Sequence, residues 1–167
     1  MGQILYFGVD QAYEHYDNVI AISGSKSGIL SGILHRNLLE SALAHIQVDD
    51  YYPTMTHKLT HLVFSIAKSH CFTDGNKRTA IVLGGYFLTI NGYENLVPQF
   101  FIEMENIVLW VAANLISKDT LFVIIEDLIA LGELSEDTKL GLVGILEKYD
   151  EMIRDSGLNS TEKGSQA

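Results

Sequence analysis

The sequence has little cysteine, proline and positive charge, and it lacks a long apolar run. Its single cysteine, Cys71, excludes an intramolecular disulfide. No stretch reaches the roughly 18 apolar residues of a membrane span, and the start has no signal-peptide pattern, so we expect a cytoplasmic protein without a membrane partner. Lys and Arg number 11 against 21 Asp and Glu, a net charge of −10 that disfavours duplex nucleic acid as a partner.

Length and composition indicate one folded domain, because 167 residues with 47% hydrophobic side chains are enough for a single core. The two prolines, Pro53 and Pro98, and the many apolar spacings of three and four favour an all-α fold. We predict helices over about 10–22, 35–47, 55–70, 77–91, 100–117, 121–131 and 138–154.

The segment 77–91 is apolar on nearly every face after its first turn, which is typical of a buried central helix. Gly84 and Gly85 lie inside it, and each glycine costs about 1 kcal/mol relative to alanine in a helix. This cost indicates that a neighbouring backbone approaches closely there.

The chemistry concentrates in residues 70–78, which read HCFTDGNKR and join two predicted helices. A loop that leads into a helix presents unpaired N–H groups and the positive end of the helix dipole, so it can bind an anion. Lys77 and Arg78 oppose that dipole, which suggests an anionic ligand. Asp74 suits Mg²⁺, and His70 suits a general base. The set favours nucleotide-dependent transfer of a phosphorus group, although a plain capping turn with a structural histidine stays open.

HCFTDGNKR closely resembles the signature H-x-F-x-D/E-G/A-N-K/G-R of the Fic/Doc family, which includes the death-on-curing toxins. The resemblance covers roughly residues 5–131 and implies a helical bundle whose buried helix follows the signature. We therefore expect a catalytic domain over 1–131. Residues 132–155 would add an amphipathic C-terminal helix packed on that domain, and 156–167 would form a disordered tail.

The resemblance also implies an enzyme that uses ATP and Mg²⁺ to modify a serine, threonine or tyrosine hydroxyl of a protein. His70 would deprotonate the hydroxyl, Asp74 would bind Mg²⁺, and Phe72 would anchor the loop in the core. The nucleotide phosphates would contact Gly75, Asn76, Lys77 and Arg78. Residues 23–32 would form a flap before the signature, with a short β-hairpin as its expected form.

Two departures from the AMP-transferring Fic enzymes favour a Doc-like kinase. Lys77 stands where those enzymes have glycine, and Ile81 stands where they have a second arginine. Conversely, Gly75 replaces the alanine of the Doc pattern and Cys71 replaces the commoner proline, so AMP transfer stays open. A non-catalytic nucleotide-binding or interaction module is a third interpretation.

The sequence contains no S/T-x-x-x-E-G/N motif, the inhibitory helix pattern of self-inhibited Fic proteins. By the same resemblance, restraint would come from an antitoxin protein. The helix over 138–154 is an alternative source of restraint, unless it only packs on the domain. The resemblance suggests elongation factor Tu as the protein substrate.

Overall fold

The computed structural model describes residues 3–23, 32 and 34–161, with side chains as far as Arg154. This part of the chain is an all-α fold, as the sequence predicts, and it contains no strand. Most of the expected flap lies outside the described residues. The elements are α1 (Val9–Ser23), α2 (Arg36–His45), α3 (Met55–Lys68), α4 (Asn76–Ile90), the 3₁₀ turn η1 (Glu94–Leu96), α5 (Val97–Ala112), α6 (Lys118–Leu131) and α7 (Glu136–Thr161).

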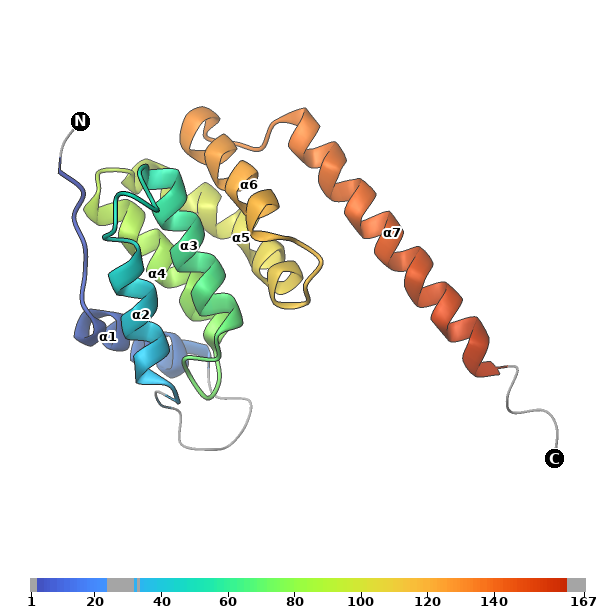
Figure 1. Ribbon diagram of the computed structural model, residues 1–167, viewed down its shortest axis with the longest axis horizontal. Helices are drawn as coiled ribbons and strands as arrows, with labels where there is room; N and C mark the ends of the chain where they lie inside the picture. The colour runs from blue at the N-terminus through green and yellow to red at the C-terminus, as the bar shows by residue number, and fades with distance from the viewer. Residues whose placement is uncertain (1–2, 24–31, 33, 162–167) are drawn as a thin grey trace.

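Helices α3 and α4 form the centre of the bundle (Figure 1). Helix α4 packs against α1, α3 and α5, and α3 also packs against α2, α5 and α6. The α4 side chains Leu83 and Phe87 are completely buried. This confirms that the segment after the signature is a buried central helix.

The two glycines of α4 lie under the rings of α5. A Cβ atom on Gly84 would meet Phe100 Cζ at 2.7 Å, and one on Gly85 would meet Phe101 Cε1 at 2.3 Å. The close approach predicted from the glycines therefore exists, but the neighbours are aromatic side chains rather than backbone.

A completely buried lysine ties the α2–α3 connection to the bundle. Lys58 Nζ donates to the Ile46 carbonyl oxygen at 2.7 Å and to Asp49 Oδ1 at 2.6 Å. It also lies 5.6 Å from the centre of the Tyr6 ring. Burial alone would lower the pKa of Lys58, but the hydrogen bonds to Asp49 and Tyr6 outweigh it, so the pKa is raised and the ammonium stays charged.

The α5–α6 connection differs from the predicted boundaries. Helix α5 begins at Val97, with Pro98 in its first turn, and ends at Ala112 rather than near Ser117. Asn114 follows with a φ of 62°, a left-handed conformation that asparagine tolerates better than most residues. Ser117 then caps α6 by accepting the Thr120 N–H at 3.1 Å. A loop over residues 113–117 therefore separates α5 from α6, where the sequence predicted that the first of these helices continues to 117.

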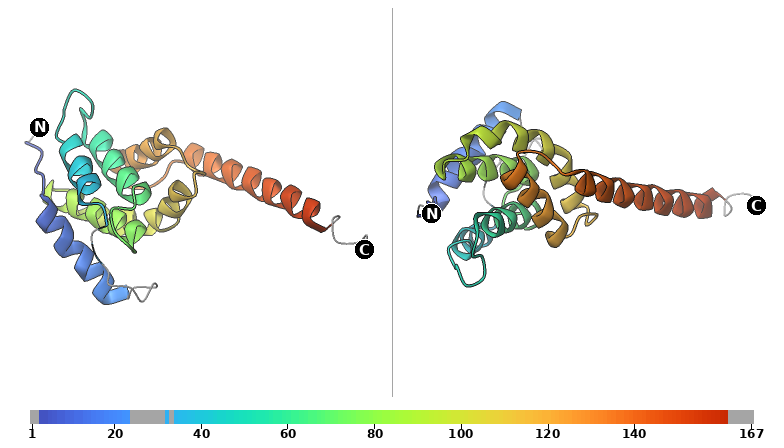
Figure 2. Two further views of the ribbon diagram at one scale, coloured as in Figure 1. Left: turned by 60° about the horizontal axis from the view of Figure 1, so that its bottom comes forward. Right: turned by 90° about the horizontal axis from the view of Figure 1, so that it is seen from above.

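Helix α7 projects away from the bundle, contrary to the expectation that it packs on the domain (Figures 1 and 2). Only its first turns lie against α6, where Leu142 is buried and Asp127 accepts hydrogen bonds from the N–H and hydroxyl of Ser135. The helix also continues to Thr161, past the predicted start of a disordered tail at residue 156. An apolar stripe predicts an amphipathic helix, but it does not specify which surface, if any, covers that stripe.

Candidate functional site

The segment 70–78 joins the end of α3 to the start of α4. His70 has a φ of 48°, an uncommon backbone conformation for a residue other than glycine. The next carbonyl, that of Cys71, accepts the N–H groups of Leu34 at 2.8 Å and His35 at 3.0 Å. Burial raises the pKa of the Cys71 thiol, although hydrogen bonding from Ser69 opposes this, and the raised pKa disfavours the thiolate nucleophile.

Phe72 and Asn76 hold the loop from inside. Phe72 is buried, and its ring stacks on Tyr16 of α1 with 4.1 Å between centroids and 9° between planes. Asn76 Oδ1 accepts the Phe72 N–H at 2.9 Å, and Asn76 Nδ2 donates to the Phe72 carbonyl oxygen at 2.7 Å. These contacts satisfy the backbone of the turn and set its shape before any ligand binds.

Gly75 is the N-cap of α4 and has a φ of 77°. This left-handed conformation favours glycine, and a Cβ atom there would also meet Ile20 Cδ1 of α1 at 3.0 Å. The Gly75 N–H lies 2.6 Å from Asp74 Oδ1. Helix α4 therefore begins beside the Asp74 carboxylate. Gly75 fits against α1 because it has no side chain.

A cavity of about 470 Å³ opens over this loop, and we call it the site cavity. Side chains from the ends of α3 and α5 and from the start of α4 surround it. Its lining comprises Ala67, Lys68, His70, Thr73, Asp74, Gly75, Asn76, Lys77, Ala112 and Asn114. The site cavity therefore brings a histidine, a carboxylate and the N-terminus of α4 together, and His70 and Lys77 are exposed to solvent there.

Arg78 is the predicted phosphate ligand that does not line the site cavity. Its guanidinium donates to Ser23 Oγ at the end of α1, and its Nη2 lies 3.7 Å from Asp74 Oδ1. Asp74 thus stands between the site cavity and Arg78. At this distance the Arg78 guanidinium forms an ion pair with the carboxylate.

Sequence reasoning missed two polar side chains of the site cavity, Lys68 and Asn114. Lys68 Nζ donates to Asn114 Oδ1, which joins the end of α3 to the loop after α5. Lys68 adds a second cation to the lining beside Lys77. A lysine two positions before the histidine was visible in the sequence, but nothing in the sequence indicated Asn114.

Thr73 connects the site cavity to the chain before α2. Its N–H donates to the Gly32 carbonyl oxygen at 3.1 Å, and its Oγ1 accepts the Gly32 N–H at 3.1 Å. Together with the bond between Arg78 and Ser23, this contact anchors both flanks of residues 24–31 to the 70–78 segment.

The residues fit a magnesium ion, which takes one or two carboxylates and completes its shell with water and phosphate oxygens. Asp74 is the carboxylate of the site cavity, beside a helix N-terminus that suits phosphate. Within the described residues, no group of three or more His, Cys, Asp or Glu side chains could hold a metal without such added ligands.

None of the described helices is long and apolar enough to cross a membrane.

Comparison with known proteins matches residues 6–88 to the sequence model described as the Fic/DOC family. A curated relative, Toxin Doc of Mycolicibacterium smegmatis (strain ATCC 700084 / mc(2)155), is 41% identical over 70 residues. That alignment covers 40% of this chain and 53% of the relative, so the chain spans about half the length of the curated protein it matches.

Proposed function

Residues 6–88 place the chain in the Fic/DOC family, and from this premise we propose that the protein is a Doc-like toxin. It would transfer the γ-phosphoryl group of ATP to a hydroxyl of a target protein. One observation carries the proposal: His70, held in an uncommon backbone conformation, shares a cavity with Asp74 and the N-terminus of α4. Uncommon backbone conformations cluster at functional sites.

In the proposed reaction, His70 accepts the proton of the target hydroxyl while the hydroxyl oxygen forms a bond to the γ-phosphorus. The bond from that phosphorus to the β–γ bridging oxygen breaks, and ADP leaves. The backbone N–H groups at the start of α4 and the cations Lys77 and Lys68 stabilise the phosphate oxygens. Asp74 would hold Mg²⁺, which supplies charge neutralisation on the phosphates when bound.

The choice of phosphoryl over AMP transfer rests on Lys77. Its side chain occupies the exposed first turn of α4, the position where AMP-transferring relatives have glycine. Gly75, which resembles the Fic pattern, favours the second candidate function, AMP transfer.

The experiment incubates the purified protein with cell lysate, Mg²⁺ and ATP labelled at either the α- or the γ-phosphate. We expect a protein band labelled from γ-labelled ATP alone, lost in His70→Ala and retained in His57→Ala, a matched histidine on α3 that does not line the site cavity. Purified elongation factor Tu is the first defined target to test, and a partner antitoxin should abolish the label.

A His70-dependent band from α-labelled ATP would replace the kinase proposal with AMP transfer. The absence of any band with either label, together with thermal stabilisation by ATP, would indicate a non-catalytic nucleotide-binding module. A label that persists in His70→Ala would overturn the proposed role of His70.

A further inference from the structure

A second cavity of about 450 Å³ lies between α3 and α6, and we call it the α3–α6 cavity. Its lining comprises Tyr52, His57, Thr60, Lys118, Asp119, Phe122 and Val123. These residues include three aromatic rings, one cation and one carboxylate. It shares no lining residue with the site cavity. The two cavities also lie at different points along α3. Thr60 of the α3–α6 cavity and Lys68 of the site cavity are eight positions apart, or about 12 Å along the helix axis.

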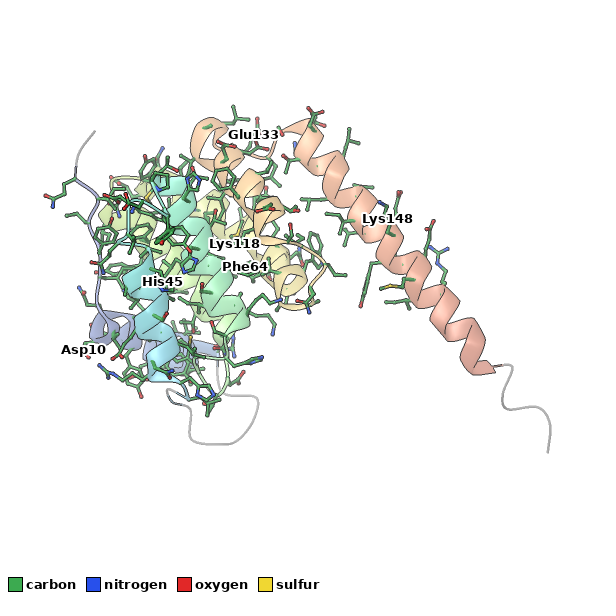
Figure 3. All side chains as sticks on the ribbon, in the orientation of Figure 1. Asp10, His45, Phe64, Lys118, Glu133 and Lys148 are labelled. Carbon is green, nitrogen blue, oxygen red and sulfur yellow. The ribbon has the colours of Figure 1, made fainter. Side chains whose placement is uncertain are left out.

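Within the described part of the chain, no carboxylate forms an ion pair with the ammonium group of Lys118. Its Nζ lies 2.8 Å from Nδ1 of His61 and 5.0 Å from the centre of the Tyr52 ring. Burial, Lys118 and His45 lower the pKa of His61 to about 4, so at neutral pH this imidazole is an uncharged acceptor. Figure 3 labels Lys118 and His45, and the His45 ring lies 5.5 Å from the His61 ring.

The position of Lys118 makes its charge unfavourable in two respects. It is the first residue of α6, where the helix dipole repels a cation. Lys118 is also half-buried, and the imidazole and the ring face that its ammonium contacts carry no full negative charge to balance it. An anion in the α3–α6 cavity would relieve both effects.

A buried hydroxyl gives independent support for a ligand. Thr60 lines the α3–α6 cavity, is 2% exposed, and its Oγ1 has no hydrogen-bond partner within the described residues. A buried hydroxyl without a partner costs about 1–3 kcal/mol, so such groups are rare unless a ligand or water satisfies them. A bound oxygen would supply that partner.

The apolar walls define the rest of the ligand. The His57 ring lies 4.6 Å from the Phe122 ring, and His57 Nδ1 is 2.7 Å from Thr54 Oγ1, which fixes the imidazole. The Tyr52 ring, whose centre is 5.0 Å from Lys118 Nζ, contributes another wall. The volume is within the range of small-molecule sites, about 300–1,000 Å³.

We propose that the α3–α6 cavity binds a small organic anion, a flat apolar ring that carries a carboxylate or phosphate group. The anionic oxygens contact Lys118 Nζ and Thr60 Oγ1, and the ring packs between Tyr52, His57 and Phe122. Asp119, an exposed residue of the lining, repels a second negative charge on the ligand. This site is independent of the proposed transfer reaction.

The test uses the full chain and four probes: benzoate, phenyl phosphate, inorganic phosphate and the neutral benzyl alcohol. Binding is followed by NMR through the ring protons of His57 and His61. We expect benzoate or phenyl phosphate to shift these signals and to raise the pKa of His61, because the anion screens Lys118. Benzyl alcohol and inorganic phosphate should each bind at least about tenfold more weakly, since benzyl alcohol lacks the negative charge and inorganic phosphate lacks the ring.

The variant Lys118→Gln keeps a donor for His61 and removes the charge, so it should weaken benzoate binding at least about tenfold. Lys77→Gln, a matched change in the site cavity, should leave binding unchanged. If Lys118→Gln does not fold, Thr60→Val replaces it, with weaker binding again expected. The proposal is overturned if neither ring-bearing anion shifts the histidine signals, or if the Lys118 and Thr60 variants bind as tightly as the original chain. Loss of binding in Lys77→Gln would place the ligand in the site cavity and would equally overturn it.

Discussion

The ring of Tyr16 lies flat on the ring of Phe72, with 4.1 Å between their centroids and 9° between their planes. Through this contact α1 forms the floor of the 70–78 segment. Both side chains are buried, and the hydroxyl of Tyr16 has no hydrogen-bond partner within the described residues.

Two substitutions at Tyr16 should therefore act in opposite directions. Tyr16→Ala removes the floor, and we expect a loss of about 3–5 kcal/mol in the free energy of unfolding. Tyr16→Phe keeps the ring and removes an unsatisfied buried hydroxyl, so stability should be unchanged or rise by about 1 kcal/mol. Urea denaturation measures both. A marked loss of stability in Tyr16→Phe would mean that the hydroxyl has a partner in solution.

The protonation of His61 should make the fold sensitive to acid. Its pKa is lowered to about 4 in the folded protein, mainly by burial and also by Lys118 and His45, from an ordinary value of 6.5. Between these values the unfolded chain binds more protons, so stability falls as the pH decreases from about 6.5 to about 4, by roughly 3 kcal/mol in total. This stability is fully present above pH 6.5.

The control is His61→Gln, which does not titrate. The difference in unfolding free energy between the two proteins should change across this pH range, because the carboxylates that titrate in both chains cancel. A constant difference would show that His61 titrates normally in the folded state.

The α4 glycines predict a contrast between two helical positions. In Gly84→Ala the new methyl carbon would lie 2.7 Å from Phe100 Cζ and 3.1 Å from Val63 Cγ2, and both neighbours are buried. We expect a loss of about 1–3 kcal/mol from overpacking. Gly141→Ala on α7 meets nothing within 4 Å and should gain up to about 1 kcal/mol from helix propensity. Thermal and urea unfolding compare the two, and a stabilised Gly84→Ala would mean that α5 moves away easily.

Removal of the outer part of α7 should leave the bundle intact. A chain that ends at Tyr149 loses Met152 and Ile153, which are 60% and 49% exposed. We expect a change within about 0.5 kcal/mol in unfolding free energy and an unchanged level of protein labelling. Increased labelling would show that α7 inhibits the site, and a large loss of stability would show that it packs on the bundle in solution.

The sequence determined much of this protein by local rules. Apolar spacing predicted the seven α-helices of the described residues, although α5 ends five residues earlier and α7 ends seven residues later than predicted, and the letters of the 70–78 segment indicated the family. The helix over 77–91 was correctly expected at the centre, since a segment without a polar face must be covered on every side.

Tertiary structure alone decided the contacts between distant residues. Lys68 and Asn114 meet in the site cavity although 46 positions separate them, and Arg78 turns towards Ser23 rather than into that cavity. Tertiary structure likewise determined that α7 projects away from the bundle (Figure 1). Periodicity records which face of a helix is apolar, but which surface that face meets depends on the packing of the whole bundle.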